Sequence, residues 1–548
     1  MQSVPHDDLD LIHFIVGHGI LRKELRDEIY CQLSCQVTNN PSKENTLRGW
    51  ILFALCAGCF QPSDKLGPFL RSFWREASAD YKDYAAYIVR TLRRTSANGM
   101  RYHPPNWLEY QATKVKKYVI LPVYIPDGSI QSLEADSSTT SSEMIQKIAR
   151  NLNIKDSFGF SIYICIFDKV SSLGSGLDHV MDAITECEQI VRTKGKVEDV
   201  APWRLYFRKE LFTPWHDPEL DRIASDLIYK QICKGVKVDE YRFKSEEELS
   251  RFAARRLYIE DGSEIIPGKL QSNLHEYLPE RALNAGKNRE GWTQAILAAF
   301  NSQGFSKKLV PQKQVQWHVI ATAPRKWPVQ FSGLFEATVL DNPILPRTDA
   351  VIALSSKGFF VLDDSLNVLI ALHFYEIVEV LYQRAHKAKP GTFTILSVKG
   401  SEFTCASHNS ETIAKILRTF LDGLRRRSRW AVGLQDFTME DHSDKYSATL
   451  NFELGDVIEL LNESEINEKT KKADWLYGRC ERTKQKGQFP FDAVYVLPTY
   501  ERPPIKFLDM FVSMSRAETN TLPKKRGVVV ISQGTIGRHG GHGIDTSA

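Results

Sequence analysis

The stretch KKYVILPVYIPDGSIQSLEADSSTTSSEMIQKIARNL, residues 116–152, changes its hydrophobic period once along its length. Apolar residues alternate with polar ones on both sides of Asp127-Gly128, a pair that favours the tight turn of a β-hairpin. Ser141-Ser142 can cap a helix. The apolar residues beyond this pair recur at helical spacing: Met144, Ile145, Ile148 and Leu152. The stretch therefore predicts two antiparallel strands followed by an amphipathic helix.

The flanking residues extend this pattern in two different ways. Further strands are expected at 160–167 and 203–207, and strands, helix and strands in this order are typical of a ubiquitin-like roll. Residues 1–112, in contrast, show helical spacing. Within them GWILFALCAGCF, residues 49–60, is apolar on nearly every side, as a buried helix is. The N-terminal part is therefore predicted to be a helical domain.

The C-terminal half alternates between helical and extended segments. A helical block is expected from about 213 to 320, and strands return from 329 to 398. The helix SETIAKILRTFLDGLRRR, residues 410–427, then presents one apolar face. About seven strands closed by one helix predict a pleckstrin-homology-like sandwich. Residues 430–498 read as short strands, and the Gly-, Ser- and Thr-rich residues after 499 are expected to be mostly disordered.

Length and composition indicate a multidomain protein of the cytosol. The chain has 548 residues, so about 150 residues per domain gives three or four domains. Its formal net charge of +4 is too small to indicate nucleic-acid binding by itself. Nine cysteines without a framework spacing are typical of reduced thiols. No signal peptide or apolar membrane-spanning run is found in the sequence.

The sequence offers no residues for catalysis. It contains no Gly-x4-Gly-Lys-Ser/Thr phosphate loop, no His-Glu-x-x-His and no Gly-x-Ser-x-Gly. Cys56 and Cys59 match C-x-x-C, and Cys31 and Cys35 lie one helical turn apart. Zinc is the alternative reading of these four thiols, but a C-x-x-C inside an apolar helix is more typical of buried hydrophobic side chains. Neither a metal nor a cofactor is predicted.

Basic residues gather at several places and are candidates for a partner-binding surface. The candidates are Lys114, Lys116, Lys117, Arg425, Arg426 and Arg427. Such clusters can bind acidic peptides, tubulin or phosphoinositide head groups. The structural alternative is a solvated surface, and arginines that finish a helix also interact with the negative end of its dipole.

Residues 430–498 resemble a Src homology 3 (SH3) domain. LNFELGDVI, residues 450–458, is similar to the diverging turn of that family. Phe437, Trp475, Pro490 and Tyr495 occupy the positions of its peptide groove, where a polyproline helix binds between aromatic side chains. Two departures weaken the expected binding of Pro-x-x-Pro peptides: the family's tyrosine pair is reduced to Gln435 and Phe437, and its groove asparagine is Val494. The alternative is a purely structural barrel.

The order of these parts resembles the first half of a class VII unconventional myosin tail. LRDEIYCQL, RGWILFALC and FQPS are similar to a myosin tail homology 4 (MyTH4) domain. A ubiquitin-like roll, a helical lobe and a pleckstrin-homology-like sandwich in this order resemble a FERM domain. FDKVSSLGSGLDHVMDAI and APWRLYFRKELFTPWH are similar to the class VII tail itself. The resemblance implies a multidomain α+β architecture with these parts: a partial MyTH4 domain at 1–112, a ubiquitin-like FERM lobe at 113–212, a helical FERM lobe at 213–322, a pleckstrin-homology-like FERM lobe at 323–428, an SH3-like domain at 429–499 and a disordered tail at 500–548.

The resemblance also implies a function in cargo binding without catalysis. In that family the MyTH4 and FERM domains bind adaptor or scaffold proteins in actin-based protrusions, and some members contact microtubules. Acidic membrane lipids are a further candidate partner, whereas nucleic acid is not expected. The ATPase motor that binds actin lies upstream in such myosins, so the chain is expected to be a fragment whose MyTH4 domain lacks part of its cover. The alternative is a motor-free FERM scaffold that links membrane or adaptor proteins to the cytoskeleton.

Overall fold

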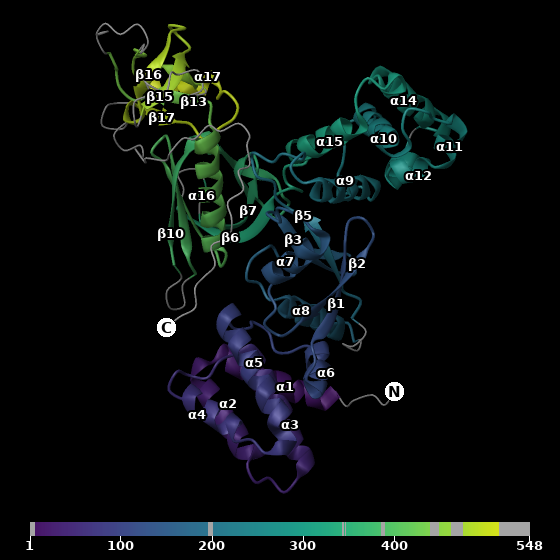
Figure 1. Ribbon diagram of the computed structural model, residues 1–548, viewed down its shortest axis with the longest axis vertical. Coiled ribbons are helices and arrows are strands. Elements are labelled where there is room, and N and C mark those ends of the chain that lie inside the picture. The colour runs from purple at the N-terminus through teal and green to yellow at the C-terminus, as the bar shows by residue number, and fades with distance from the viewer. Residues whose placement is uncertain are drawn as a thin grey trace. The chain divides into compact units, whose positions relative to one another are not determined.

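The computed structural model describes residues 6–195, 201–285, 287–341, 345, 347–384, 390–438, 449–461 and 475–513. The chain divides into two compact units, which are described separately. The first comprises residues 1–212 and 216–332, and the second comprises residues 213–215 and 333–548. Figure 1 labels the helices and strands of both units.

The first unit begins with a helical domain in which one helix lies at the centre. Its helices are α1 (His6–Leu21), α2 (Arg26–Val37), α3 (Lys43–Cys59), α4 (Gly67–Arg75), α5 (Lys82–Asn98) and α6 (Trp107–Val115). The apolar helix α3 contacts α1, α2, α5 and α6. Ser42 caps α3 by accepting a hydrogen bond from the Asn45 backbone N–H.

The apolar side chains of α3 and of Phe60 after it are covered, contrary to the sequence-based expectation. Ile51, Leu55 and Phe60 are 8%, 1% and 0% exposed. Gly19 of α1 packs so closely that a Cβ there would lie 2.3 Å from the Phe60 ring. The expectation that this face lacks a cover is therefore wrong, because α1 and its neighbours supply the cover within the same domain.

A ubiquitin-like lobe follows in the same unit. Its sheet has the order β2-β1-β5-β3-β4, with β1 (Val119–Tyr124), β2 (Ile130–Ala135), β3 (Phe160–Ile166), β4 (Lys169–Ser172) and β5 (Arg204–Lys209). The predicted hairpin pairs β1 with β2, and β5 lies parallel to β1. Thr140, one residue before the expected pair, caps α7 (Ser141–Leu152). The sequence-based assignment missed α8 (Val180–Thr193).

Helices alone make up the rest of the first unit, which we call the helical lobe. It contains α9 (Arg222–Lys237), α10 (Glu246–Asp261), α11 (Pro267–Ser272), α12 (Leu274–Tyr277), α13 (Glu280–Asn284), α14 (Arg289–Ser302) and α15 (Gln312–Lys326). Its core is continuous with the core of the ubiquitin-like lobe. Trp292, on α14, is fully buried in this core.

The second unit begins with a seven-stranded antiparallel sheet of order β10-β11-β12-β6-β7-β8-β9. Its strands are β6 (Gly333–Asp341), β7 (Thr348–Ser355), β8 (Gly358–Leu362), β9 (Val368–His373), β10 (Ile377–Gln383), β11 (Thr392–Ser397) and β12 (Glu402–Ala406). Helix α16 (Ser410–Arg427) packs on β10 and β11 (Figure 1). We call this part the sandwich lobe, and it has the seven strands and closing helix that the sequence predicted.

A small β-domain completes the second unit. It is a five-stranded antiparallel sheet of order β16-β15-β14-β13-β17. Its strands are β13 (Trp430–Gly433), β14 (Val457–Leu460), β15 (Trp475–Cys480), β16 (Lys486–Pro490) and β17 (Val494–Val496). A last helix, α17 (Ile505–Ser513), follows. The expectation of disorder after 499 is wrong for this segment, and the remaining tail, 514–548, lies outside the described residues.

Candidate partner-binding surfaces

Two arginines from the helical domain hold it to the ubiquitin-like lobe. Arg94, on α5, is the first. Its Nε lies 3.0 Å from Asp136 Oδ2, and its Nη1 and Nη2 donate to the two carboxylate oxygens of Glu143 at 2.5 and 2.6 Å. The hydrogen bonds from Arg94 lower the pKa of Glu143 to about 2. This forked, charge-assisted geometry ties α5 to the start of α7.

The second arginine, Arg101, is fully buried. Its Nη1 donates to Glu109 Oε1 and its Nε to Asp182 Oδ1, both at 2.6 Å, and its side chain is 0% exposed. Asp182 also accepts the backbone N–H groups of Tyr102 and His103. A buried guanidinium requires charged partners. Glu109 lies on α6 and Asp182 on α8, so Arg101 fixes the position of these two helices relative to each other.

The predicted lysine cluster lies where α6 ends, and two of its members are engaged by tyrosine rings. Lys114 Nζ lies 3.9 Å from the ring centroid of Tyr110, and Lys116 Nζ lies 4.3 Å from that of Tyr84. Burial lowers the pKa of Lys114. Only Lys117 of the three is exposed. The structure therefore brings the three lysines together, but two of their ammonium groups already make cation–π contacts.

The predicted arginine cluster, in contrast, diverges at the end of α16. Arg425 Nη2 donates to the Val378 carbonyl at 2.6 Å. Arg427 lies over the ring of Trp215 with its Cζ 4.7 Å from the centroid, and Arg426 is exposed. These residues belong to the second unit, whereas the lysine cluster belongs to the first. Each arginine of the cluster thus has different surroundings.

The edge of the sandwich lobe beside α16 is occupied by two side chains of that helix. Arg418 Nε donates to the Val380 carbonyl at 2.9 Å, and Arg425 donates to the Val378 carbonyl. β10 is an outer strand of the sheet, and its register against β11 shifts between Ile377 and Glu379. The two arginines occupy two backbone acceptors of this outer strand, and we expect them to oppose the addition of another strand there. The spacing of residues along the chain gave no indication that Arg418 contacts β10.

The small β-domain gathers three of its four predicted groove residues. The Phe437 and Trp475 rings lie 6.0 Å apart in a T-shaped contact, and Trp475 is paired in register with Pro490 across β15 and β16. All three are partly exposed. We call these two aromatic rings and the proline beside them the aromatic patch.

Tyr495, the fourth predicted groove residue, lies elsewhere. It is 3% exposed and packs in a separate apolar cluster with Phe511, at a ring distance of 6.1 Å. Burial raises its pKa, an effect that Arg425 opposes. The structure thus separates Tyr495 from the other three, because it lies in the middle of β17 and faces this second cluster.

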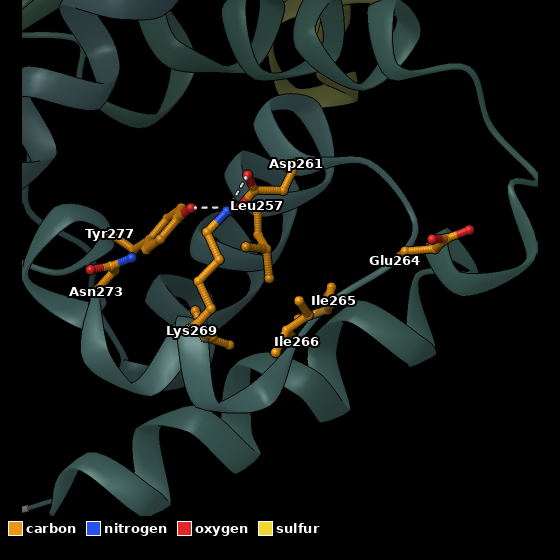
Figure 2. A pocket seen from close by; sticks show the side chains of 9 residues that line it. Leu257, Asp261, Glu264, Ile265, Ile266, Lys269, Asn273 and Tyr277 are labelled. Atoms are coloured by element: carbon orange, nitrogen blue, oxygen red, sulfur yellow. Dashed lines mark hydrogen bonds and ion pairs between the residues drawn. The ribbon is translucent and has the colours of Figure 1, made fainter.

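A small hollow lies in the helical lobe between α10, α11 and α12. Its volume is about 100 Å³. Figure 2 shows Lys269 and Tyr277 converging on Asp261, with Lys269 Nζ 3.3 Å from Oδ1 and the Tyr277 hydroxyl 3.1 Å from Oδ2. Ile265 and Ile266 line another part of the hollow. Ligand pockets typically measure about 300–1,000 Å³, so this hollow is too small for a nucleotide.

Two of the four candidate zinc thiols are buried, whereas Cys31 and Cys35 are exposed. Cys56 and Cys59 are fully buried in α3, and burial raises their pKa values. Burial lowers the pKa of His216 to about 4. Among the described residues, no cluster of three or more His, Cys, Asp or Glu side chains is arranged to hold a metal ion. Likewise, none of the described helices is long and apolar enough to cross a bilayer.

Family comparisons match three segments of the chain. Residues 12–112 match the MyTH4 domain, residues 117–211 match the RA like domain, and residues 331–427 match the Myosin-X FERM PH domain-like family. These segments lie in the helical domain, the ubiquitin-like lobe and the sandwich lobe.

Relatives and solved structures agree with this assignment. The chain is 44% identical to Myosin-VIIa of Drosophila melanogaster over 93% of its own length and 23% of the relative's. It is 36% identical to Unconventional myosin-VIIb of Mus musculus over 92% and 23%. The chain thus spans about a quarter of the length of these relatives. The MF1 MyTH4-FERM domain of Dictyostelium discoideum Myosin VII shares the fold, with a TM-score of 0.54, 20% identity and coverage of 76% of this chain and 84% of that one.

A second solved structure with the same fold contains a partner. It is the C-terminal MyTH4-FERM domain of human Myosin 7b in complex with the harmonin-a PDZ3 domain. It has a TM-score of 0.50 and 23% identity, and the alignment covers 77% of this chain and 84% of that one.

Proposed function

Because the chain is a MyTH4–FERM tail region of the class VII myosin type, we propose that it is a binding module for adaptor or scaffold proteins. The observation that carries this proposal is the junction made by Arg94 and Arg101, which holds the helical domain and the ubiquitin-like lobe as one body. A surface that spans both parts can then bind a partner without first ordering them, and preorganisation reduces the entropic cost of binding.

The proposed partner is an adaptor protein with an acidic segment. Lys117 is exposed beside Lys114 and Lys116, whose ammonium groups stay at the protein surface over tyrosine rings. Such a cluster steers an acidic segment and acts mainly on the association rate. Microtubules, whose surface is acidic, and acidic lipids are alternative ligands for the same lysines. A PDZ-domain protein, as in the Myosin 7b complex, is a candidate adaptor class.

The domain boundaries expected from the sequence are part of the proposal, as is the SH3-like character of residues 429–499. We propose that the aromatic patch of Phe437, Trp475 and Pro490 binds proline-rich segments weakly. Gln435 is exposed beside it and supplies no aromatic ring. In the whole protein the module would join cargo to an upstream actin-based motor in cytoskeletal protrusions, and it would carry out no catalysis of its own.

Charge reversal tests the adaptor site. Lys114, Lys116 and Lys117 are changed together to Glu, and adaptor fragments are captured by the purified chain at ionic strengths from about 50 to 300 mM, where the Debye length shortens markedly. We expect slower association and a weaker salt dependence. Reversal of Lys307 and Lys308, an exposed pair on the helical lobe, is the control and changes two lysines where the test variant changes three. Capture that is indifferent to both the reversal and the salt would contradict the proposed site.

A further inference from the structure

The last described helix, α17, buries one face completely. Phe507, Leu508 and Phe511 are 8%, 4% and 0% exposed. Ile505 on the opposite face is 63% exposed, and Asp509 is also exposed. The buried residues stand at i, i+1 and i+4, so they form one stripe along the helix.

Two different domains form the groove that receives this stripe. The sandwich lobe contributes Tyr375, Val378 and Val398, and the small β-domain contributes Val432, Leu434, Tyr495 and Leu497. The Tyr375 and Phe507 rings lie 4.7 Å apart. We call this apolar surface the α17 groove. It exists only because the two domains lie against each other within the second unit.

The stability of helix α17 depends on the groove. A helix of nine residues is far shorter than the roughly 12–15 residues that a marginally stable isolated helix needs. The segment that leads into α17 contains Arg502, whose Nε and Nη2 lie 2.9 and 2.8 Å from the Glu481 carboxylate. This ion pair is exposed, and such pairs contribute little. Burial of the apolar stripe is therefore what keeps α17 in place.

We propose that the α17 groove is a docking site for amphipathic helices, and that α17 occupies it as an internal competitor. The partner chemistry follows from the occupant: a helix that carries Phe-Leu-x-x-Phe, with polar residues on its other face. Because α17 is tethered, its effective concentration at the groove is high, and a partner helix binds only when it displaces α17. This inference deepens the proposed function. It rests on that function, because it assumes that the adaptor proteins supply the competing helix.

The test uses the full chain and a labelled peptide of residues 501–513. Phe507 and Phe511 are both changed to Asp in the chain, which removes the internal competitor without altering the groove. The opened chain is expected to bind the peptide roughly 10- to 100-fold more tightly than the unchanged chain, as loss of a tethered competitor predicts. Ile505→Asp, which adds one negative charge to the exposed face where the test variant adds two to the buried face, should leave the groove closed. A peptide with both phenylalanines changed to Asp should not bind.

Equal peptide affinity for the opened and unchanged chains, or no binding to an opened chain that melts cooperatively, would overturn the inference. Amide hydrogen exchange measured on the unchanged chain is a second test, and it needs no variant. The amides of α17 should exchange at least ten times faster than those of β17, because the helix opens locally; equal protection would count against displacement. Adaptor capture through the lysine cluster is measured in parallel, since its failure bears on the proposed function and not on the groove.

Discussion

Replacing Arg101 by Met should destabilise the first unit by about 3 kcal/mol. The guanidinium holds Glu109 and Asp182 through hydrogen bonds of 2.6 Å, and the two carboxylate side chains are only 1% and 11% exposed. Removing one partner of a buried ion pair costs about 3–5 kcal/mol, since the other charge stays buried without its partner. Asp182 keeps two backbone N–H donors, of Tyr102 and His103, so the lower end of that range applies.

Urea unfolding of the whole chain measures this loss. The two compact units are expected to unfold in separate transitions, so each is followed on its own. A loss of about 3 kcal/mol moves the midpoint of the first transition by about 1 M for an m-value near 3 kcal/mol/M. Trypsin should also cleave the variant faster between the helical domain and the ubiquitin-like lobe, because local opening exposes the backbone there.

A matched control separates the buried network from the charge alone. Arg93→Met removes one positive charge from the exposed face of α5, and surface substitutions of this kind stay within about 0.5 kcal/mol. Arg101→Lys keeps the charge but loses the fork that reaches both carboxylates. It should therefore lower the free energy of unfolding by more than half as much as Arg101→Met does. If Arg101→Met moved the first transition no further than Arg93→Met does, the reasoning would be refuted.

Three further predictions concern the other sites. Proline-rich peptides should bind the small β-domain only weakly, and Trp475→Ala should abolish what binding there is; low-micromolar affinity by titration would contradict this. The pKa of His216 is about 4 in the folded state against an ordinary value of about 6.5, so the folded state binds fewer protons between these values. Stability should therefore fall by up to ~3 kcal/mol as pH drops from about 6.5 to 4, and His216→Gln should remove that slope from denaturant midpoints measured across this range. Changing Arg418 and Arg425 to Ala should free two carbonyl groups of β10 and promote strand addition, which increased self-association in sedimentation would show; an unchanged monomer would argue against the capping role.

The structure also changes what can be expected of substitutions near the sandwich edge. A bulky residue at Val398, which directly follows β11, would block strand addition near this edge without unfolding only if Val398 were exposed. Val398 is 3% exposed and lies in the cluster beneath α17. A Trp there should instead disrupt the packing between the two domains, since overpacking a filled core forces its neighbours apart.

Local pattern predicted most of the elements because their signals are contained in short segments. The Asp127-Gly128 turn, the period change before α7 and the apolar stripe of α16 each lie within about 20 residues, so helical and extended spacing identify them. The misses have the same origin. The sequence analysis assigned no element to residues 180–193, which form α8, and α17 lies in a stretch whose overall composition favours disorder.

The candidate sites were predicted less well, because they depend on which distant residues meet. Phe437, Trp475 and Pro490 lie together in space, since neighbouring strands of one small sheet bring them together. Tyr495 was not, because the direction of its side chain depends on the packing of β17 against other elements.

The sequence by itself determined the kinds of element, their order and the family to which they belong, because hydrophobic period and turn residues act over a few residues. Only the tertiary structure decided which charges are buried and which surfaces are free. Arg101 and Asp182 stand 81 residues apart, and Arg425 reaches a carbonyl 47 residues away. No spacing rule connects such pairs. Their meeting follows from how whole apolar faces pack, which is a property of the folded chain and not of any segment.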